Sequence, residues 1–243
     1  MEQHDKHHHE SHHNHHNHHN HHNHHTITEN EIITTVSYKD KVLRVHLEDK
    51  EGNTPELNVT HEELIHLIVV SEDLNEYYHL HPRQINDSTF EKEITLTGHL
   101  YKAFVDINPK GKGYVIEPLP FKVDPASHPS HYHVDTVLQI DRQLTKEING
   151  KTVELKHDPF EVGKDIKLTF NIENATPEPY LGALGHVVII DNKVEEFIHV
   201  HPISDHETVF EAHFDKPGIY KLWAEFKFDE EVIAFPYVIE VKQ

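Results

Sequence analysis

The chain has 243 residues, a formal net charge of −20 with histidine counted as neutral, and no cysteine. This acidic balance argues against nucleic acid or an anionic membrane surface as a partner. The missing cysteines exclude disulfides and thiolate metal ligands, and because Met1 is the only methionine, the soft ligands that favour Cu(I) are absent as well.

Residues 1–30 are predicted to form a disordered His-rich tail, because residues 2–25 offer no apolar side chain to bury. Most of its histidines come in pairs separated by single asparagines, unlike the uninterrupted run of a purification tag. Imidazole binds Zn²⁺, Ni²⁺ and Cu²⁺, so such a tract should hold several ions weakly. The candidate ligands are His12, His13, His15, His16, His18, His19, His21, His22, His24 and His25.

The same stretch has no apolar signal-peptide core. No later run approaches the roughly 20 apolar residues of a membrane-spanning helix. We therefore expect a cytoplasmic protein without membrane insertion.

The body of the chain shows short strand patterns and few helix signals. Residues 42–47 and 166–172 alternate apolar and polar side chains, and similar segments recur about every ten residues. This pattern predicts an all-β fold of two tandem immunoglobulin-like antiparallel β-sandwich domains. We place them at residues 31–124 and 135–243, with a linker at 125–134.

A histidine pattern occurs twice. His66 precedes an apolar run, and His79 and His81 follow six mostly polar residues and a second apolar segment that ends at Pro82. The same pattern recurs 120 positions later, at His186, His199, His201 and Pro202. Such internal similarity indicates a repeated structural unit.

Each unit is typical of a β-hairpin. If Val70 pairs with Tyr77, then His66 lies opposite His81, and His79 lies on the same face. In the second unit the same register, with Ile190 opposite Phe197, places His186 opposite His201. We interpret each set of three as a candidate metal site. The alternative is a duplicated structural motif whose histidines hydrogen-bond the sheet.

Other polar residues near these hairpins have open roles. Asp106 and Glu225 occupy matching positions late in each unit. We favour solvent-facing strand residues there, with orientation of an imidazole as the alternative. His61 has no histidine counterpart in the second unit but can complete a four-coordinate site.

No catalytic motif is found. His61 and His66 are five positions apart, whereas the zincin helix requires histidines four apart. A G-x-S-x-G elbow, a P-loop and a Rossmann glycine fingerprint are all missing. No general base accompanies the candidate metal ligands, so we do not expect an enzyme.

The segments 61–74 and 79–82, and their counterparts 179–190 and 199–202, resemble a bacterial family of tandem β-sandwich proteins. The two His-x-His-Pro elements are the most specific part of this resemblance, which covers roughly residues 40–243. More distantly, the chain is similar to YtkA-like domains. The resemblance implies a metal-linked binding role, because that family occurs in heavy-metal and copper-handling contexts and is often exported. This chain differs in its His-rich leader and in showing no export signal.

Taken together, these patterns predict a protein that binds or buffers transition-metal ions, or delivers them as a chaperone does. Zn²⁺ and Ni²⁺ are the leading candidates, followed by Cu²⁺. One alternative is an adhesion or protein-interaction module with metal held only by the tail. A second alternative is a metal-dependent hydrolase.

Overall fold

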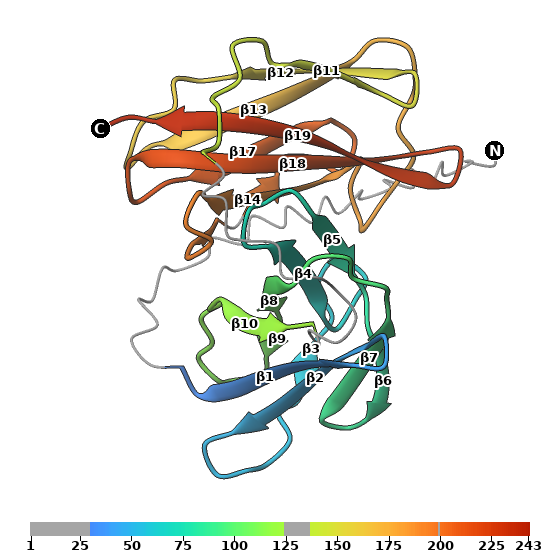
Figure 1. The fold of residues 1–243 in the computed structure, drawn as a ribbon. Helices are drawn as coiled ribbons and strands as arrows, with labels where there is room; N and C mark the ends of the chain where they lie inside the picture. Colours follow the sequence, from blue (N-terminus) through green and yellow to red (C-terminus); the bar gives the residue numbers. More distant parts are fainter. Residues whose placement is uncertain (1–29, 124–136, 199) are drawn as a thin grey trace, which may run out of the picture.

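The computed structural model describes residues 30–123, 137–198 and 200–243. These residues form strands and turns without a helix, which confirms the all-β prediction (Figure 1). Most of the predicted tail and the whole predicted linker lie outside the described residues. No described segment is a helix that is long and apolar enough to cross a membrane.

Residues 30–123 form the first sandwich. One sheet has the strand order β1-β2-β7-β6, and the facing sheet has the order β10-β8-β4-β5. A small pair, β3-β9, lies beside them. The strands are β1 (Ile32–Lys39), β2 (Val42–Asp49), β3 (Leu57–Asn58), β4 (His66–Ser71), β5 (Tyr77–Leu80), β6 (Arg83–Asn86), β7 (Thr89–Glu93), β8 (Leu100–Asp106), β9 (Asn108–Pro109) and β10 (Leu119–Lys122).

Residues 137–198 and 200–243 form the second sandwich. Its sheets have the orders β11-β12-β13-β17-β16 and β15-β14-β18-β19. The strands are β11 (Thr145–Ile148), β12 (Lys151–His157), β13 (Asp165–Ile172), β14 (His186–Asp191), β15 (Phe197–Ile198), β16 (Val200–Pro202), β17 (Val209–His213), β18 (Gly218–Phe228) and β19 (Glu231–Val241).

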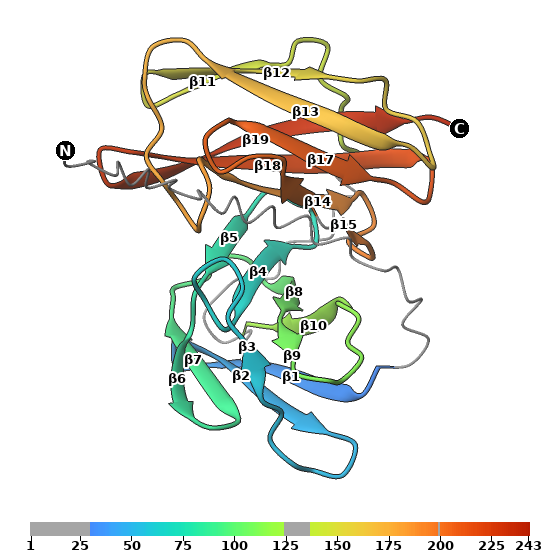
Figure 2. The ribbon, with the colours of Figure 1, turned by 180° about the vertical axis from the view of Figure 1, so that it is seen from behind.

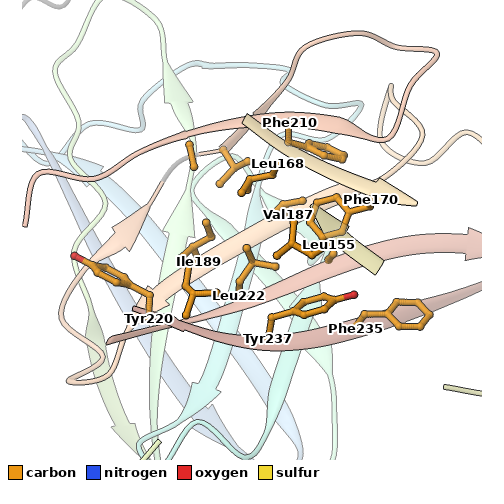
Figure 3. Packing of buried hydrophobic residues seen from close by; sticks show 14 of the residues in the cluster. Leu155, Leu168, Phe170, Val187, Ile189, Phe210, Tyr220, Leu222, Phe235 and Tyr237 are labelled. Carbon is orange, nitrogen blue, oxygen red and sulfur yellow. The ribbon is translucent and has the colours of Figure 1, made fainter. Parts of the chain in front are cut away.

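Each sandwich has its own hydrophobic core between its two sheets. In the second sandwich, Leu168 and Phe170 of one sheet pack toward Val187 and Leu222 of the other (Figure 3). These residues alternate with more exposed ones along β13, as expected for a strand with one face on a core.

A third core joins the two sandwiches. All six residues of β4 are buried, because both faces of this strand are covered. Leu67 and Val69 point into the first core, whereas Ile68 and Val70 point toward the second sandwich. Figures 1 and 2 show β4 and β14 meeting at this junction.

Equivalent residues of the two repeats meet reciprocally at the junction. Tyr77 stacks on Trp223 with ring centroids 4.6 Å apart, and their counterparts Phe197 and Phe104 lie 5.7 Å apart. Lys221 Nζ donates to the Leu74 carbonyl at 2.7 Å, and its counterpart Lys102 donates to the Val194 carbonyl at 3.1 Å. The two sandwiches therefore pack like the subunits of a two-fold dimer.

Candidate metal centre

The first hairpin has the predicted register. Val70 pairs with Tyr77, and the ladder continues to Leu67 opposite Leu80. His66 begins β4 and His81 follows the last residue of β5, so both lie at the open end of the hairpin. His66 shares the outward face of Ile68 and Val70, which places it at the junction with the second sandwich.

Three imidazole nitrogens converge there. His66 Nδ1 lies 3.1 Å from His79 Nε2, and His81 Nε2 lies 3.3 Å from the same atom. Each of the three residues offers a nitrogen within 4.8 Å of the others. The structure thus brings His66, His79 and His81 together, and we name this group the His cluster.

The outer nitrogens of two of these rings are held by hydrogen bonds. His66 Nε2 lies 2.9 Å from the Thr60 carbonyl, which can only accept, so the ring must donate. His79 Nδ1 donates to Glu225 Oε2 at 2.6 Å. In the neutral rings, His66 Nδ1 and His79 Nε2 therefore carry lone pairs that face each other.

The second sandwich supplies Glu225 and a fourth histidine. Glu225 lies on β18 directly opposite His186 on β14, just as Asp106 on β8 lies opposite His66 on β4. The His186 ring centroid is 4.6 Å from that of His79 and 5.9 Å from that of His66. His186 Nδ1 is 3.6 Å from Glu225 Oε2 and has no hydrogen-bond partner among the described residues.

Burial disfavours the charged forms of His66, His81 and His186, whereas Glu225 is ionised. Desolvation, reinforced by the neighbouring histidines, lowers the pKa of His66 to about 3 and that of His81 to about 4. Burial also lowers the pKa of His186. Burial alone would raise the pKa of Glu225, but His79 and His186 outweigh it and bring this pKa down to about 2. Glu225 is thus an ionised acceptor in a nearly dry site.

Two further residues border the cluster. The His61 ring lies 5.9 Å from His66 and 6.1 Å from His186, on a turn where its φ is 48°. Desolvation raises the pKa of Asp106, although the nearby histidines oppose this shift. Both residues lie close enough to influence the charge of the site.

The prediction that His201 lies opposite His186 is wrong, because the second hairpin keeps the predicted register for only two residue pairs. Ile190 pairs with Phe197 as expected, but the chain then leaves this sheet. His201 lies on β16 opposite Glu211 of β17, in the other sheet, and not opposite His186. Val200, which pairs with Ala212 of β17, packs in the core of the second sandwich from this other sheet. His199 lies outside the described residues.

The sequence did not reveal that one site draws on both repeats. The sequence pattern favours a solvent-facing Glu225, but the Glu225 side chain is only 5% exposed and contacts His79. Alternation along β18 places Glu225 on the same face of the strand as Lys221 and Trp223, and Trp223 is buried at the junction. A large apolar residue on that face was the sequence signal that Glu225 is covered. The tail histidines His12 to His25 lie outside the described residues, so their role as ligands stays a prediction.

A second grouping, of His79, His186 and Glu225, also brings three potential ligand atoms together. Its shortest distance, 2.6 Å between His79 Nδ1 and Glu225 Oε2, is that of a charge-assisted hydrogen bond. Ligands of one Zn²⁺ at about 2.0–2.1 Å and tetrahedral angles lie farther apart, at about 3.3 Å. The His cluster matches that separation better, and Glu225 then serves as an outer carboxylate that orients His79.

Fold and site define a tandem β-sandwich protein with a histidine cluster between its sandwiches. The chain belongs to the family described as a domain of unknown function (DUF8832), whose model matches residues 23–124 and again residues 146–243. No curated protein matches the sequence.

Several solved structures are similar in fold. The Escherichia coli adhesin FdeC is 13% identical, with 87% of this chain and 64% of that chain covered and a TM-score of 0.27. The BSP domain of a biofilm-associated protein is 12% identical, with 87% of this chain and 30% of that chain covered and a TM-score of 0.24. The FN1–FN3 domains of chicken CNTN1 are 8% identical, with 88% of this chain and 67% of that chain covered and a TM-score of 0.25. This chain therefore spans less than two thirds of the first two structures. The likeness is one of β-sandwich architecture.

Proposed function

We propose that this protein binds and buffers a transition-metal ion at the His cluster, and that it is not an enzyme. His66 Nδ1, His79 Nε2 and His81 Nε2 are the ligands. Glu225 and the Thr60 carbonyl accept hydrogen bonds from the far nitrogens of His79 and His66, the outer-shell arrangement typical of metal-bound histidines.

The observation that carries this proposal is the 3.1 Å contact between His66 Nδ1 and His79 Nε2, which carry facing lone pairs when both rings are neutral. Such a contact is repulsive unless a positive charge lies between the rings. A proton can join His79 to one neighbour at a time, whereas a metal ion can bond all three nitrogens together. The His81 nitrogen, 3.3 Å from the same atom, favours the metal ion.

Zn²⁺ is the metal that we propose first. The nitrogen separations of 3.1 and 3.3 Å are close to the roughly 3.3 Å edge of a tetrahedral zinc site. Ni²⁺ and Cu²⁺ also accept imidazole and are the next candidates. The His-rich tail would collect ions at many weak sites, and the His cluster would retain one of them.

Zinc titration of the protein tests the proposal. All described strands begin at Ile32 or later, so a chain that starts at residue 26 retains every strand and lacks the tail histidines. We expect this chain to bind one equivalent of Zn²⁺ tightly by calorimetry. The replacement His81→Ala should abolish that equivalent.

The matched control is His201→Ala, which removes the corresponding histidine of the second repeat from an exposed position on the other sheet. Zinc binding should survive this change. No saturable binding by the shortened chain, or equal losses in both variants, would contradict the proposal.

The second candidate is an adhesion or protein-interaction module in which only the tail binds metal. Two of the proteins with a similar fold are an adhesin and a domain of a biofilm-associated protein. The interaction-module candidate is favoured if the chain that lacks residues 1–25 binds no zinc.

A further inference from the structure

The His cluster depends on both sandwiches. Its three nitrogens belong to the first sandwich, but the acceptor that fixes the His79 proton belongs to the second. Glu225 reaches His79 only because β18 is held against the first sandwich by the junction core.

We propose that Glu225 is the positioning residue of the metal site, and that docking of the second sandwich therefore controls metal affinity. This inference rests on the proposed function. With Glu225 in place, the proton of His79 stays on Nδ1 and the lone pair on Nε2 points at the ion. Without it, His79 can place its proton on Nε2, where it blocks the metal.

The geometry gives no substitute for Glu225 in the first sandwich. The carboxylate equivalent to Glu225 is Asp106, and β-sheet pairing places it opposite His66. The His79 side chain, whose Nδ1 is hydrogen-bonded to Glu225, is only 1% exposed. Water therefore cannot replace Glu225 as the acceptor for Nδ1. Removing an outer-shell partner of this kind typically lowers metal affinity 10–100-fold.

The junction can be disturbed far from the ligands. Leu74 is 1% exposed and packs in the junction core at the turn that follows β4. The end of β4 lies about 17 Å along the strand from His66, at roughly 3.3 Å per residue over five residues. A charge at Leu74 thus weakens docking without touching the His cluster.

The test compares zinc affinity of full-length variants by competition with a chromophoric chelator. His81→Ala is added to each background as the blank for ions held elsewhere. We expect Glu225→Gln to lower the His81-dependent affinity 10–100-fold. Glu154→Gln, the same chemical change on β12 in the other sheet of the second sandwich, should change it less than threefold. Nitrogen NMR should show His79 protonated on Nδ1 in the native chain, and mixed in Glu225→Gln. Glu225→Asp should restore part of the zinc affinity and part of the Nδ1-protonated form of His79.

Leu74→Asp should lower the affinity as well, whereas Ile33→Asp, at a position that is 45% exposed in the first sandwich, should not. Because the chain has no cysteine, spin labels at two introduced cysteines can report the distance between the sandwiches. If Leu74→Asp prevents folding, Lys221→Met tests the same docking contact, because it removes the bond to the Leu74 carbonyl and the cation–π contact with Trp223.

The outcomes are separable. If His81→Ala changes nothing in the native background, the proposed function itself fails. If the native site binds zinc but Glu225→Gln leaves affinity and tautomer unchanged, the positioning role is overturned. If the labels show separated sandwiches with native zinc affinity, control by docking is overturned.

Discussion

The contact between His79 and Glu225 allows a sharp prediction for the stability of the metal-free protein. The two side chains are 1% and 5% exposed and lie 2.6 Å apart. Replacing one member of such a buried pair leaves the other without compensation. His79→Leu strands the ionised carboxylate and should cost about 3–5 kcal/mol of unfolding free energy. Glu225→Leu strands only an N–H donor and should cost less, about 1–3 kcal/mol.

The double variant completes a thermodynamic cycle. Replacing both residues by leucine removes the two uncompensated groups together, so its cost should fall well below the sum of the single costs. Urea unfolding in excess chelator at pH 8 measures all four free energies. Additive costs, or a smaller loss for His79→Leu than for Glu225→Leu, would show that the buried pair does not act as described.

Three further predictions concern pH, the junction and the entry to β14. In chelator, stability should fall as pH drops below 6.5. His66 and His81 have pKa values of about 3 and 4 in the folded protein, so they bind protons in the unfolded chain at a pH where the folded protein does not. Together the two histidines should lower the free energy of unfolding by roughly 4 kcal/mol between pH 8 and pH 5. A urea midpoint that does not change over this pH range would contradict the prediction. Trp223→Ala should cost about 3–5 kcal/mol in urea unfolding, and Trp223→Phe less, because the indole fills the junction core. Gly185→Ala should cost about 1–3 kcal/mol and weaken zinc binding, because its β-carbon would lie 2.6 Å from a Phe226 ring carbon and 2.8 Å from the Glu225 carbonyl. Calorimetry on that variant checks the second effect.

The hairpins could be predicted from the sequence because their signals are local. A six-residue polar segment between two apolar runs leaves little freedom in how Val70 and Tyr77 pair, and the structure has that register. Convergence of His66, His79 and His81 followed directly from it. The all-β class followed from strand patterns repeated along the chain.

The location of the site between sandwiches could not be predicted in the same way. A strand such as β4 is apolar at every position, and this pattern indicates that both faces are covered without saying by what. The covering surface comes from residues about 120 positions away. Glu225 looked like a polar residue on an outer face because its partner, His79, belongs to the other repeat.

The departure of His201 has a similar cause. Leu80 of the first repeat remains paired with Leu67, whereas Val200 at the equivalent position pairs with Ala212 in the opposite sheet. Both residues are apolar and can join either sheet. Each packs against the core of its own sandwich, so its apolar character does not indicate which of the two sheets the strand joins.

The reciprocal junction makes the candidate site depend on both repeats. Two equivalent hairpins that meet across a two-fold axis bring the histidines of one repeat beside the carboxylate of the other. A lone sandwich would leave His79 Nδ1 facing water, where its proton and its tautomer are free to change. Docking replaces that water with a single ionised acceptor, Glu225. The docked position is held by the packing of Tyr77 on Trp223 and of Ile68 and Val70 against the second sandwich, and this packing therefore fixes the orientation of the His79 ring. The apolar junction and the polar cluster therefore depend on each other, so a change in either should be measurable in both.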